Sequence, residues 1–234
     1  MNKIVPLILF FFAVCIFSSC YKSSETTTVK PVQTSDRSTP VSEKSVQPAN
    51  QTLQAKSGDF VQSVNDYNSK NYEKAVNGLR EVVKADSENS QAQYYLGKSL
   101  QGLQKEEDAI TAFREAVRIK PNYAEANFEL GNIYYKRKEY ETSLPFYEKA
   151  AKVDYKSTKT LSALGDNYLV LKKYEYAVVQ FQKIIGFEPE NANAYYNLGL
   201  TYVGLNNKIA ARQQYQKVLQ LDKKLAEKLF AAIN

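Results

Sequence analysis

Hydrophobic and polar positions divide the 234-residue chain into three stretches with different patterns. Residues 4–17 form an almost unbroken apolar run, and residues 21–55 are rich in Ser, Thr and Pro, with Tyr21 as the only aromatic residue. From about residue 56 onward, apolar and small residues recur at spacings of three and four, which is typical of amphipathic α-helices. The pattern predicts an apolar leader, a polar segment too poor in apolar residues to form a core, and an all-helical domain.

The helical stretch repeats itself every 34 residues. The dipeptide Leu-Gly occurs four times at this spacing, and each Gly is followed after 12, 16 and 19 positions by a small, an aromatic and a small or aliphatic residue. The members are Leu96-Gly97, Ala109, Phe113 and Ala116; Leu130-Gly131, Ser143, Tyr147 and Ala150; Leu164-Gly165, Ala177, Phe181 and Ile184; and Leu198-Gly199, Ala211, Tyr215 and Val218. A weaker unit precedes them, with Gln62-Ser63 where Leu-Gly would lie.

This period and order of residues resemble the tetratricopeptide repeat, a unit of two antiparallel helices. The resemblance implies an all-α fold over residues 56–234, namely a right-handed α-solenoid of about five helix-turn-helix repeats. The repeats would cover residues 56–89, 90–123, 124–157, 158–191 and 192–225, with a capping helix over 225–234. We expect each Leu-Gly glycine to let its two helices approach closely, because a side chain there would force them apart.

The apolar leader predicts export. After the basic start at Lys3, the run is shorter than the roughly 20 residues that a membrane-spanning helix needs. The residues Phe17-Ser18-Ser19-Cys20 resemble a bacterial lipobox, although Phe17 replaces the usual Leu, Val or Ile. The resemblance implies a signal peptide over residues 1–19 and a lipid attached to Cys20. The alternative is an ordinary secretory signal followed by an incidental cysteine.

Residues 20–55 would then be a lipidated cysteine and a disordered Ser/Thr/Pro-rich tether. The alternative is that part of this segment pairs as an edge strand. The resemblance to lipoproteins places the protein in a bacterial cell envelope. Because Tyr21 is not the Asp that retains many lipoproteins in the inner membrane, the outer membrane is favoured, with the domain facing the periplasm or the surface.

Composition excludes much enzyme chemistry. The chain has no His and only two Cys, so it can form neither a Ser-His-Asp triad, nor a histidine-containing zinc site, nor a Cys₄ site. We therefore predict no enzyme activity, no cofactor, no metal and no small-molecule substrate. The formal charge is +6, but basic and acidic residues are interspersed, which argues against nucleic-acid binding. The run Lys136-Arg137-Lys138 predicts either a solvated turn or a contact with anionic lipid or glycan.

The resemblance also implies a partner-binding groove, since partners of tetratricopeptide proteins commonly bind the concave face lined by the first helices. Carried onto this sequence, the groove residues are Phe60, Tyr67, Tyr94, Lys98, Phe128, Asn132, Tyr135, Lys159 and Tyr196. The alternative is that these aromatic residues only fill consensus positions of the repeat. A clamp for a C-terminal carboxylate is not expected, because Phe128 lies where its second lysine would be needed.

Together these features predict a membrane-anchored, non-enzymatic scaffold of the bacterial cell envelope. It would bind a protein or peptide partner in the groove and serve in envelope, pilus or secretion-system assembly. The alternative function is a surface-displayed adhesin or antigen that contacts host molecules.

Overall fold

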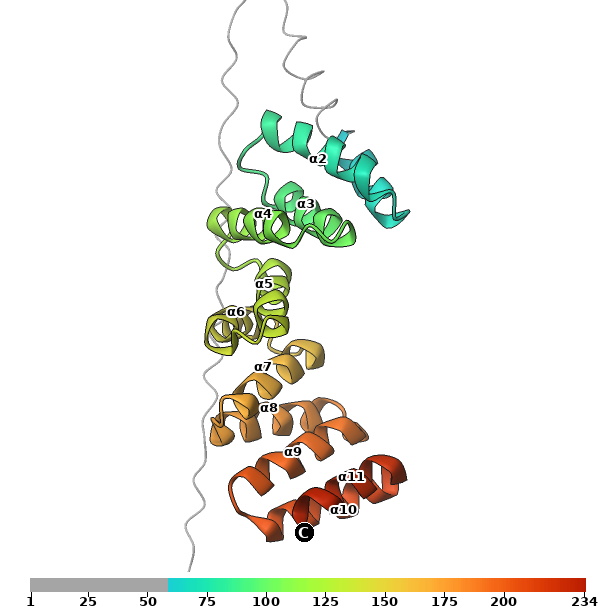
Figure 1. Cartoon of the computed structure of the whole chain (residues 1–234), viewed down its shortest axis with the longest axis vertical. Helices are drawn as coiled ribbons and strands as arrows, with labels where there is room; N and C mark the ends of the chain where they lie inside the picture. The colour runs from blue at the N-terminus through green and yellow to red at the C-terminus, as the bar shows by residue number, and fades with distance from the viewer. Residues whose placement is uncertain (1–58) are drawn as a thin grey trace, which may run out of the picture. The chain divides into compact units, whose positions relative to one another are not determined.

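The computed structural model of the chain describes residues 59–234 (Figure 1). The predicted signal peptide, Cys20 and the predicted tether over 20–55 lie outside these residues. The described residues form helices and turns and contain no strand, and they begin with a helical segment at 59–68. The helices that follow are α2 (Tyr72–Ala85), α3 (Ser90–Gly102), α4 (Glu106–Ile119), α5 (Ala124–Lys136), α6 (Tyr140–Val153), α7 (Thr158–Val170), α8 (Tyr174–Phe187), α9 (Ala192–Gly204), α10 (Lys208–Leu221) and α11 (Lys223–Ile233).

The helices stack in chain order as a solenoid. From α2 to α11 each helix packs against the next, and α5 also contacts α7, α7 contacts α9, and α9 contacts α11. Helices α5, α7, α9 and α11 therefore lie next to one another along one side, and the first three of them are first helices of the 34-residue units. The structure confirms the all-α solenoid that the repeat pattern predicts.

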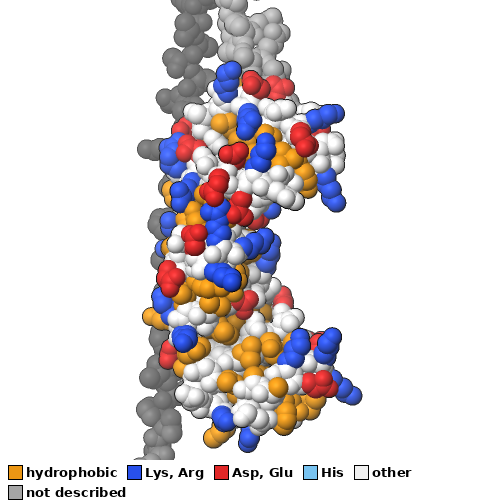
Figure 2. All heavy atoms as spheres, viewed as in Figure 1, with side chains coloured by type: hydrophobic (Ala, Val, Ile, Leu, Met, Phe, Trp, Pro, Cys, Tyr) orange, Lys and Arg blue, Asp and Glu red, His pale blue; other side chains and the backbone are white. Residues whose placement is uncertain are grey.

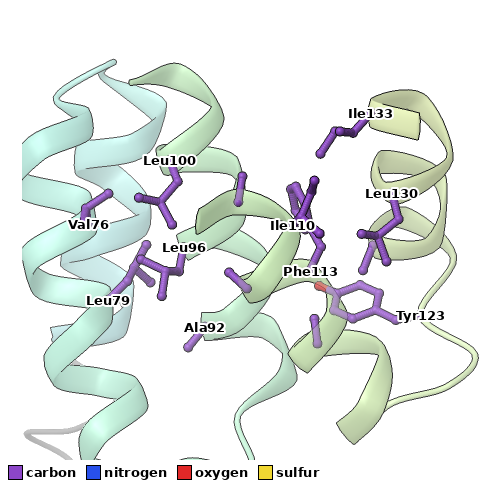
Figure 3. Packing of buried hydrophobic residues seen from close by; sticks show 14 of the residues in the cluster. Val76, Leu79, Ala92, Leu96, Leu100, Ile110, Phe113, Tyr123, Leu130 and Ile133 are labelled. Carbon is purple, nitrogen blue, oxygen red and sulfur yellow. The ribbon is translucent and has the colours of Figure 1, made fainter. Parts of the chain in front are cut away.

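The Leu-Gly glycines lie at tight helix crossings. A Cβ atom added to Gly97 would lie 2.6 Å from the Phe113 ring of α4, and one added to Gly131 would lie 2.7 Å from the Tyr147 ring of α6. Real Cβ atoms do not approach other atoms so closely, so glycine is required at both positions. Figure 3 shows Phe113 in the core between α3 and α5, on the side of Leu130 and Tyr123. The expected role of the Leu-Gly dipeptide is confirmed.

In the first unit the glycine at the helix crossing is on the second helix and not on the first. Ser63 occupies the position of the Leu-Gly glycine and is 3% exposed. Its partner across the crossing is Gly78 of α2, where an added Cβ would lie 3.3 Å from the Ser63 Cβ and closer still to its Oγ. The glycine has thus moved to the second helix, which makes room for the serine on the first.

The last unit differs from the pattern for another reason. Tyr215 holds the place of Phe113 and Tyr147, yet it is only half-buried and packs on Phe230, with ring centroids 5.6 Å apart. Leu229 of α11 lies against Gly199 instead, 2.6 Å from where a Cβ would be. From its place in the repeat, Tyr215 would be expected to fill this space as Phe113 and Tyr147 do, but the terminal helix packs closely on α9 and Leu229 occupies it.

The turn between the two helices of each unit contains a residue whose backbone φ is positive, in the left-handed region. Positive φ occurs at five non-glycine residues spaced 34 apart, with φ between 56° and 63°. They are Lys70, Gln104, Lys138, Lys172 and Asn206. Backbone bonds close the turns, as from Lys105 N to Leu100 O at 2.9 Å. Only Asn206 is of a type that tolerates this conformation well.

A buried polar pair joins α6 to α7. Ser143 replaces the usual alanine at the second-helix position, and both Ser143 and Asn167 are 0% exposed. The Asn167 Nδ2 donates a hydrogen bond to the Ser143 Oγ, while the Asn167 Oδ1 is buried without a partner among the described residues. The departure at Ser143 is therefore matched by a polar residue on the next unit.

Candidate partner-binding groove

The first helices of the central units line three hollows. Their volumes are about 350, 460 and 430 Å³, and most of their lining residues come from α3, α5, α7 and α9. We call the surface formed by these three hollows the groove. It lies on the first helices, where the resemblance to the tetratricopeptide repeat predicts that a partner binds.

The first hollow brings three predicted residues together. Tyr94, Phe128 and Lys159 line it, along with Glu125 and Glu129. The Lys159 ammonium lies 4.5 Å from the centroid of the Phe128 ring, a favourable cation–π position. Phe128 is only 8% exposed, so most of its ring lies in the core and a small part of its surface lines the hollow.

Tyr94 likewise serves both core and groove. Its ring contacts those of Tyr95, Phe113 and Tyr123, with centroids 5.3, 5.9 and 5.2 Å away. Burial, followed by the nearby Glu129 carboxylate, raises the pKa of the Tyr94 hydroxyl above its usual value. The hydroxyl therefore stays protonated and can donate a hydrogen bond.

The second hollow contains the predicted residues Tyr67 and Lys98. The Lys98 Nζ pairs with the Glu129 Oε1 of the next unit at 2.7 Å, and the two side chains are 24% and 13% exposed. This ion pair joins the first two hollows, because Glu129 lines both of them. The pair therefore bridges α3 and α5 on the groove side.

Asn132 and Tyr135 lie further along α5. The Tyr147 hydroxyl donates a hydrogen bond to the Asn132 Oδ1 at 2.9 Å, which fixes the side-chain amide of Asn132. The Tyr135 ring lies edge-on to Tyr147 at 6.3 Å. Burial, followed by the charge of Asp166, raises the pKa of Tyr135.

The third hollow is polar. Lys159, Ser162, Asp166 and Asn197 line it together with residues of the turn before α9. The Asn197 Nδ2 donates a hydrogen bond to the Asp166 Oδ1 at 2.9 Å. Burial raises the pKa of the Asp166 carboxyl to about 6.

Four predicted residues line none of the three hollows: Asn132 and Tyr135, described above, and Phe60 and Tyr196. Phe60 packs edge-on against Tyr95, with ring centroids 6.0 Å apart. Tyr196 is partly buried against the small core of Ala211, Val218 and Leu229 at the carboxyl end. Both residues contribute to packing in the described part of the chain.

Glu129 and Asn197 are groove residues that the aromatic pattern did not select. They form two pairs across neighbouring units, Lys98 with Glu129 and Asp166 with Asn197, and each pair is separated by 31 residues in sequence. Pairs of complementary polar residues 31 positions apart on successive first helices are a sequence signal that could have identified Glu129 and Asn197.

The basic run at the α5–α6 turn is partly neutralised. The Arg137 Nε and Nη2 donate to Glu106 and Glu107 of the preceding unit at 2.6 and 2.5 Å. Lysines 136 and 138 remain exposed. Figure 2 shows basic and acidic side chains interspersed over the visible face, with hydrophobic atoms between them.

Within residues 59–234, no group of three or more His, Cys, Asp or Glu side chains is placed to hold a metal ion. In the same range, no helix has both the length and the apolar character required to cross a membrane.

Family models recognise the repeats directly. A model described as "TPR repeat" matches residues 103–137, and two described as "Tetratricopeptide repeat" match residues 124–157 and 192–225. The described fold is thus a solenoid of tetratricopeptide repeats, as the Leu-Gly pattern predicts. No curated protein sequence is matched by this chain.

Several solved structures have the same fold. YrrB, described as "a TPR protein with an unusual peptide-binding site", aligns with a TM-score of 0.68 and 19% identity, over 79% of this chain and 98% of its own. A MamA structure aligns with a TM-score of 0.62 and 23% identity, over 70% and 96%. MamA from Desulfovibrio magneticus RS-1 aligns with a TM-score of 0.63 and 22% identity, over 72% of this chain and 96% of its own.

Proposed function

We propose that this protein is a lipid-anchored, non-enzymatic scaffold of a bacterial cell envelope that binds a protein or peptide partner in the groove. The observation that carries the proposal is the row of hollows on the first helices, where aromatic surface alternates with polar pairs. Rigid aromatic side chains beside desolvated polar groups are typical of surfaces that bind proteins. Tetratricopeptide proteins are typically interaction scaffolds, and YrrB, which shares this fold, is described as having a peptide-binding site.

The envelope location rests on the amino-terminal sequence. Two or more acyl chains at Cys20 would give stable anchoring, since each buried CH₂ contributes about 0.8 kcal/mol. A tether of 35 residues after Cys20 would span roughly 30–35 Å on average as a flexible chain. The outer membrane and a role in envelope, pilus or secretion-system assembly are parts of the same proposal, since a protein-binding domain held near a membrane suits an assembly factor.

The groove is tested by cross-linking the full chain to its partner in intact membranes. The variant Tyr94→Ala/Lys159→Glu alters the first hollow and keeps the more deeply buried Phe128. Because the Tyr94 ring also packs on the core, far-UV circular dichroism first verifies that the variant is folded. The matched control is Tyr176→Ala/Lys183→Glu on α8, where both side chains are exposed. Loss of the cross-linked partner in the groove variant alone is expected, and equal recovery from both variants would contradict the proposal.

A further inference from the structure

The third hollow holds a carboxylate that has no cationic partner. Asp166 lies on α7, and its side chain is partly buried in a hollow of about 430 Å³. Among the described residues, the Asn197 amide is its hydrogen-bond donor, and no Lys or Arg lies within ion-pair distance. An ionised carboxylate has about four acceptor sites, so most of the acceptor capacity of Asp166 is unused.

The pair at the equivalent positions of the preceding units, Lys98 and Glu129, contains both an acidic and a basic side chain. Glu129 is also partly buried between two units, and Lys98 neutralises it at 2.7 Å. The one basic residue that lines the third hollow is Lys159. It lies about two turns before Asp166 on α7, and its ammonium rests over the Phe128 ring rather than on the carboxylate. Burying a charge without a counter-charge is costly, and burial accordingly raises the pKa of this carboxyl.

The rest of the hollow suits a cationic group with several donors. Ser162, Asn193 and Asn197 supply polar side chains around Asp166. Ile184 and Ala194 supply apolar walls against which the methylene stem of a long side chain could pack. The third hollow adjoins the first, because Lys159 lines both.

We propose that the third hollow receives a Lys or Arg side chain of the bound partner segment and that Asp166 pairs with its cation. This inference rests on the proposed function and adds the chemistry of the partner. The partner segment places an apolar side chain against Tyr94, beside the Lys159–Phe128 pair, and a basic side chain a few residues away against Asp166. The cation supplies the counter-charge that α7 and its neighbours lack.

The test selects binding peptides and then asks what they carry. Random dodecapeptides displayed on phage are selected on the detergent-purified full chain, and the enriched peptides are synthesised. Their affinities are measured by fluorescence anisotropy for the wild type, Tyr94→Ala, Asp166→Asn and Glu175→Gln. The last variant removes an exposed negative charge of α8, outside the groove. Each peptide is also made with citrulline or norleucine in place of its Arg or Lys.

We expect peptides that bind in the groove, and are therefore weakened by Tyr94→Ala, to share a Lys or Arg. Asp166→Asn should weaken them about ten-fold or more and abolish the preference for the cation over its neutral analogue. Glu175→Gln should change neither the affinity of these peptides nor their preference for the cation. Groove-dependent peptides without a shared basic residue, or with equal affinity for Asp166→Asn, would overturn this inference and leave the proposed function standing. Peptides insensitive to every groove variant would overturn both.

Discussion

Gly165 of α7 lies directly against the ring of Phe181 in α8, so that a Cβ atom on the glycine would lie 2.7 Å from the Phe181 Cε1. Phe181 is 0% exposed, so its ring is enclosed by the core. We therefore predict that Gly165→Ala lowers the free energy of unfolding by about 1–3 kcal/mol, because overpacking forces the ring or the backbone to shift. Urea unfolding followed by far-UV circular dichroism measures this change.

Gly186 provides the control in the neighbouring helix. An added Cβ there has no atom within 4 Å, so Gly186→Ala meets open space and gains helix propensity. It should raise the free energy of unfolding by about 0.5–1 kcal/mol. If both alanine variants were equally stable, the crossing would not depend on the glycine.

A second prediction concerns the buried pair Ser143 and Asn167. Ser143→Ala removes the acceptor of the Asn167 amide and should cost about 1–3 kcal/mol, because a buried donor is left unsatisfied. The preceding interface carries Ala109 and Ile133 at the equivalent positions, both buried. The double variant Ser143→Ala/Asn167→Ile copies that apolar pair and should recover most of the lost stability in the same unfolding assay.

The single variant Asn167→Ile completes a double-mutant cycle with these two. The coupling energy between positions 143 and 167 is expected to be about 0.5–3 kcal/mol, since the two side chains are in contact. Additive effects within about 0.5 kcal/mol would show that the hydrogen bond does not contribute to the packing of α6 on α7.

The turns give a third prediction. Gln104 has φ of 59°, in a region that costs L-residues about 1–2 kcal/mol. Gln104→Gly removes this strain at the cost of chain entropy and should raise the melting temperature. Asn206→Gly, at the equivalent turn with φ of 56°, should change it less, because asparagine tolerates this conformation. A larger gain at Asn206 than at Gln104 would contradict this explanation.

The repeat period predicts the fold well because each unit contacts only its neighbours, so one packing solution recurs every 34 residues. It fails at Tyr215, since the unit there is followed by a single helix whose Leu229 takes the space against Gly199. The groove was predicted less completely. Aromatic residues at first-helix positions identify the hollow with Tyr94 and Phe128, whereas the role of Asp166 depends on which neighbouring side chains pair with it, and spacing alone does not reveal pairing.

A fourth prediction follows from Asp166. Its pKa is raised from 3.8 to about 6 by burial, so the folded state holds this proton more tightly than the unfolded state. Only well below pH 3.8 is the carboxyl neutral in both states. As the pH rises from there to above 6, the protein loses stability through this group, in total about 1–3 kcal/mol. Asp166→Asn should therefore be the more stable protein at pH 7, and its advantage should shrink steadily toward pH 4.

The groups facing Asp166 keep their charge over that pH range. Tyr135 of α5 and Tyr147 of α6 have pKa values raised by burial and stay neutral, and α9 contributes the uncharged Asn197. The stability difference between wild type and Asp166→Asn, measured by urea unfolding from pH 4 to 8, should therefore report Asp166 itself. A difference that does not vary with pH would contradict the raised pKa.

The two cysteines separate lipid anchoring from simple export. If Cys20 carries the acyl chains, Cys20→Ala should move the protein from the membrane pellet to the soluble fraction, because the anchoring free energy comes from the buried acyl chains. Cys15→Ala is the matched control, since this residue lies within the apolar leader and would leave with it. Fractionation of cells followed by immunoblotting shows where each variant is found, and mass spectrometry of the amino-terminal peptide shows whether Cys20 carries a lipid. If the Cys20→Ala protein stayed in the pellet, the domain would be held at the membrane by something other than its lipid, and the scaffold proposal would need a different anchor.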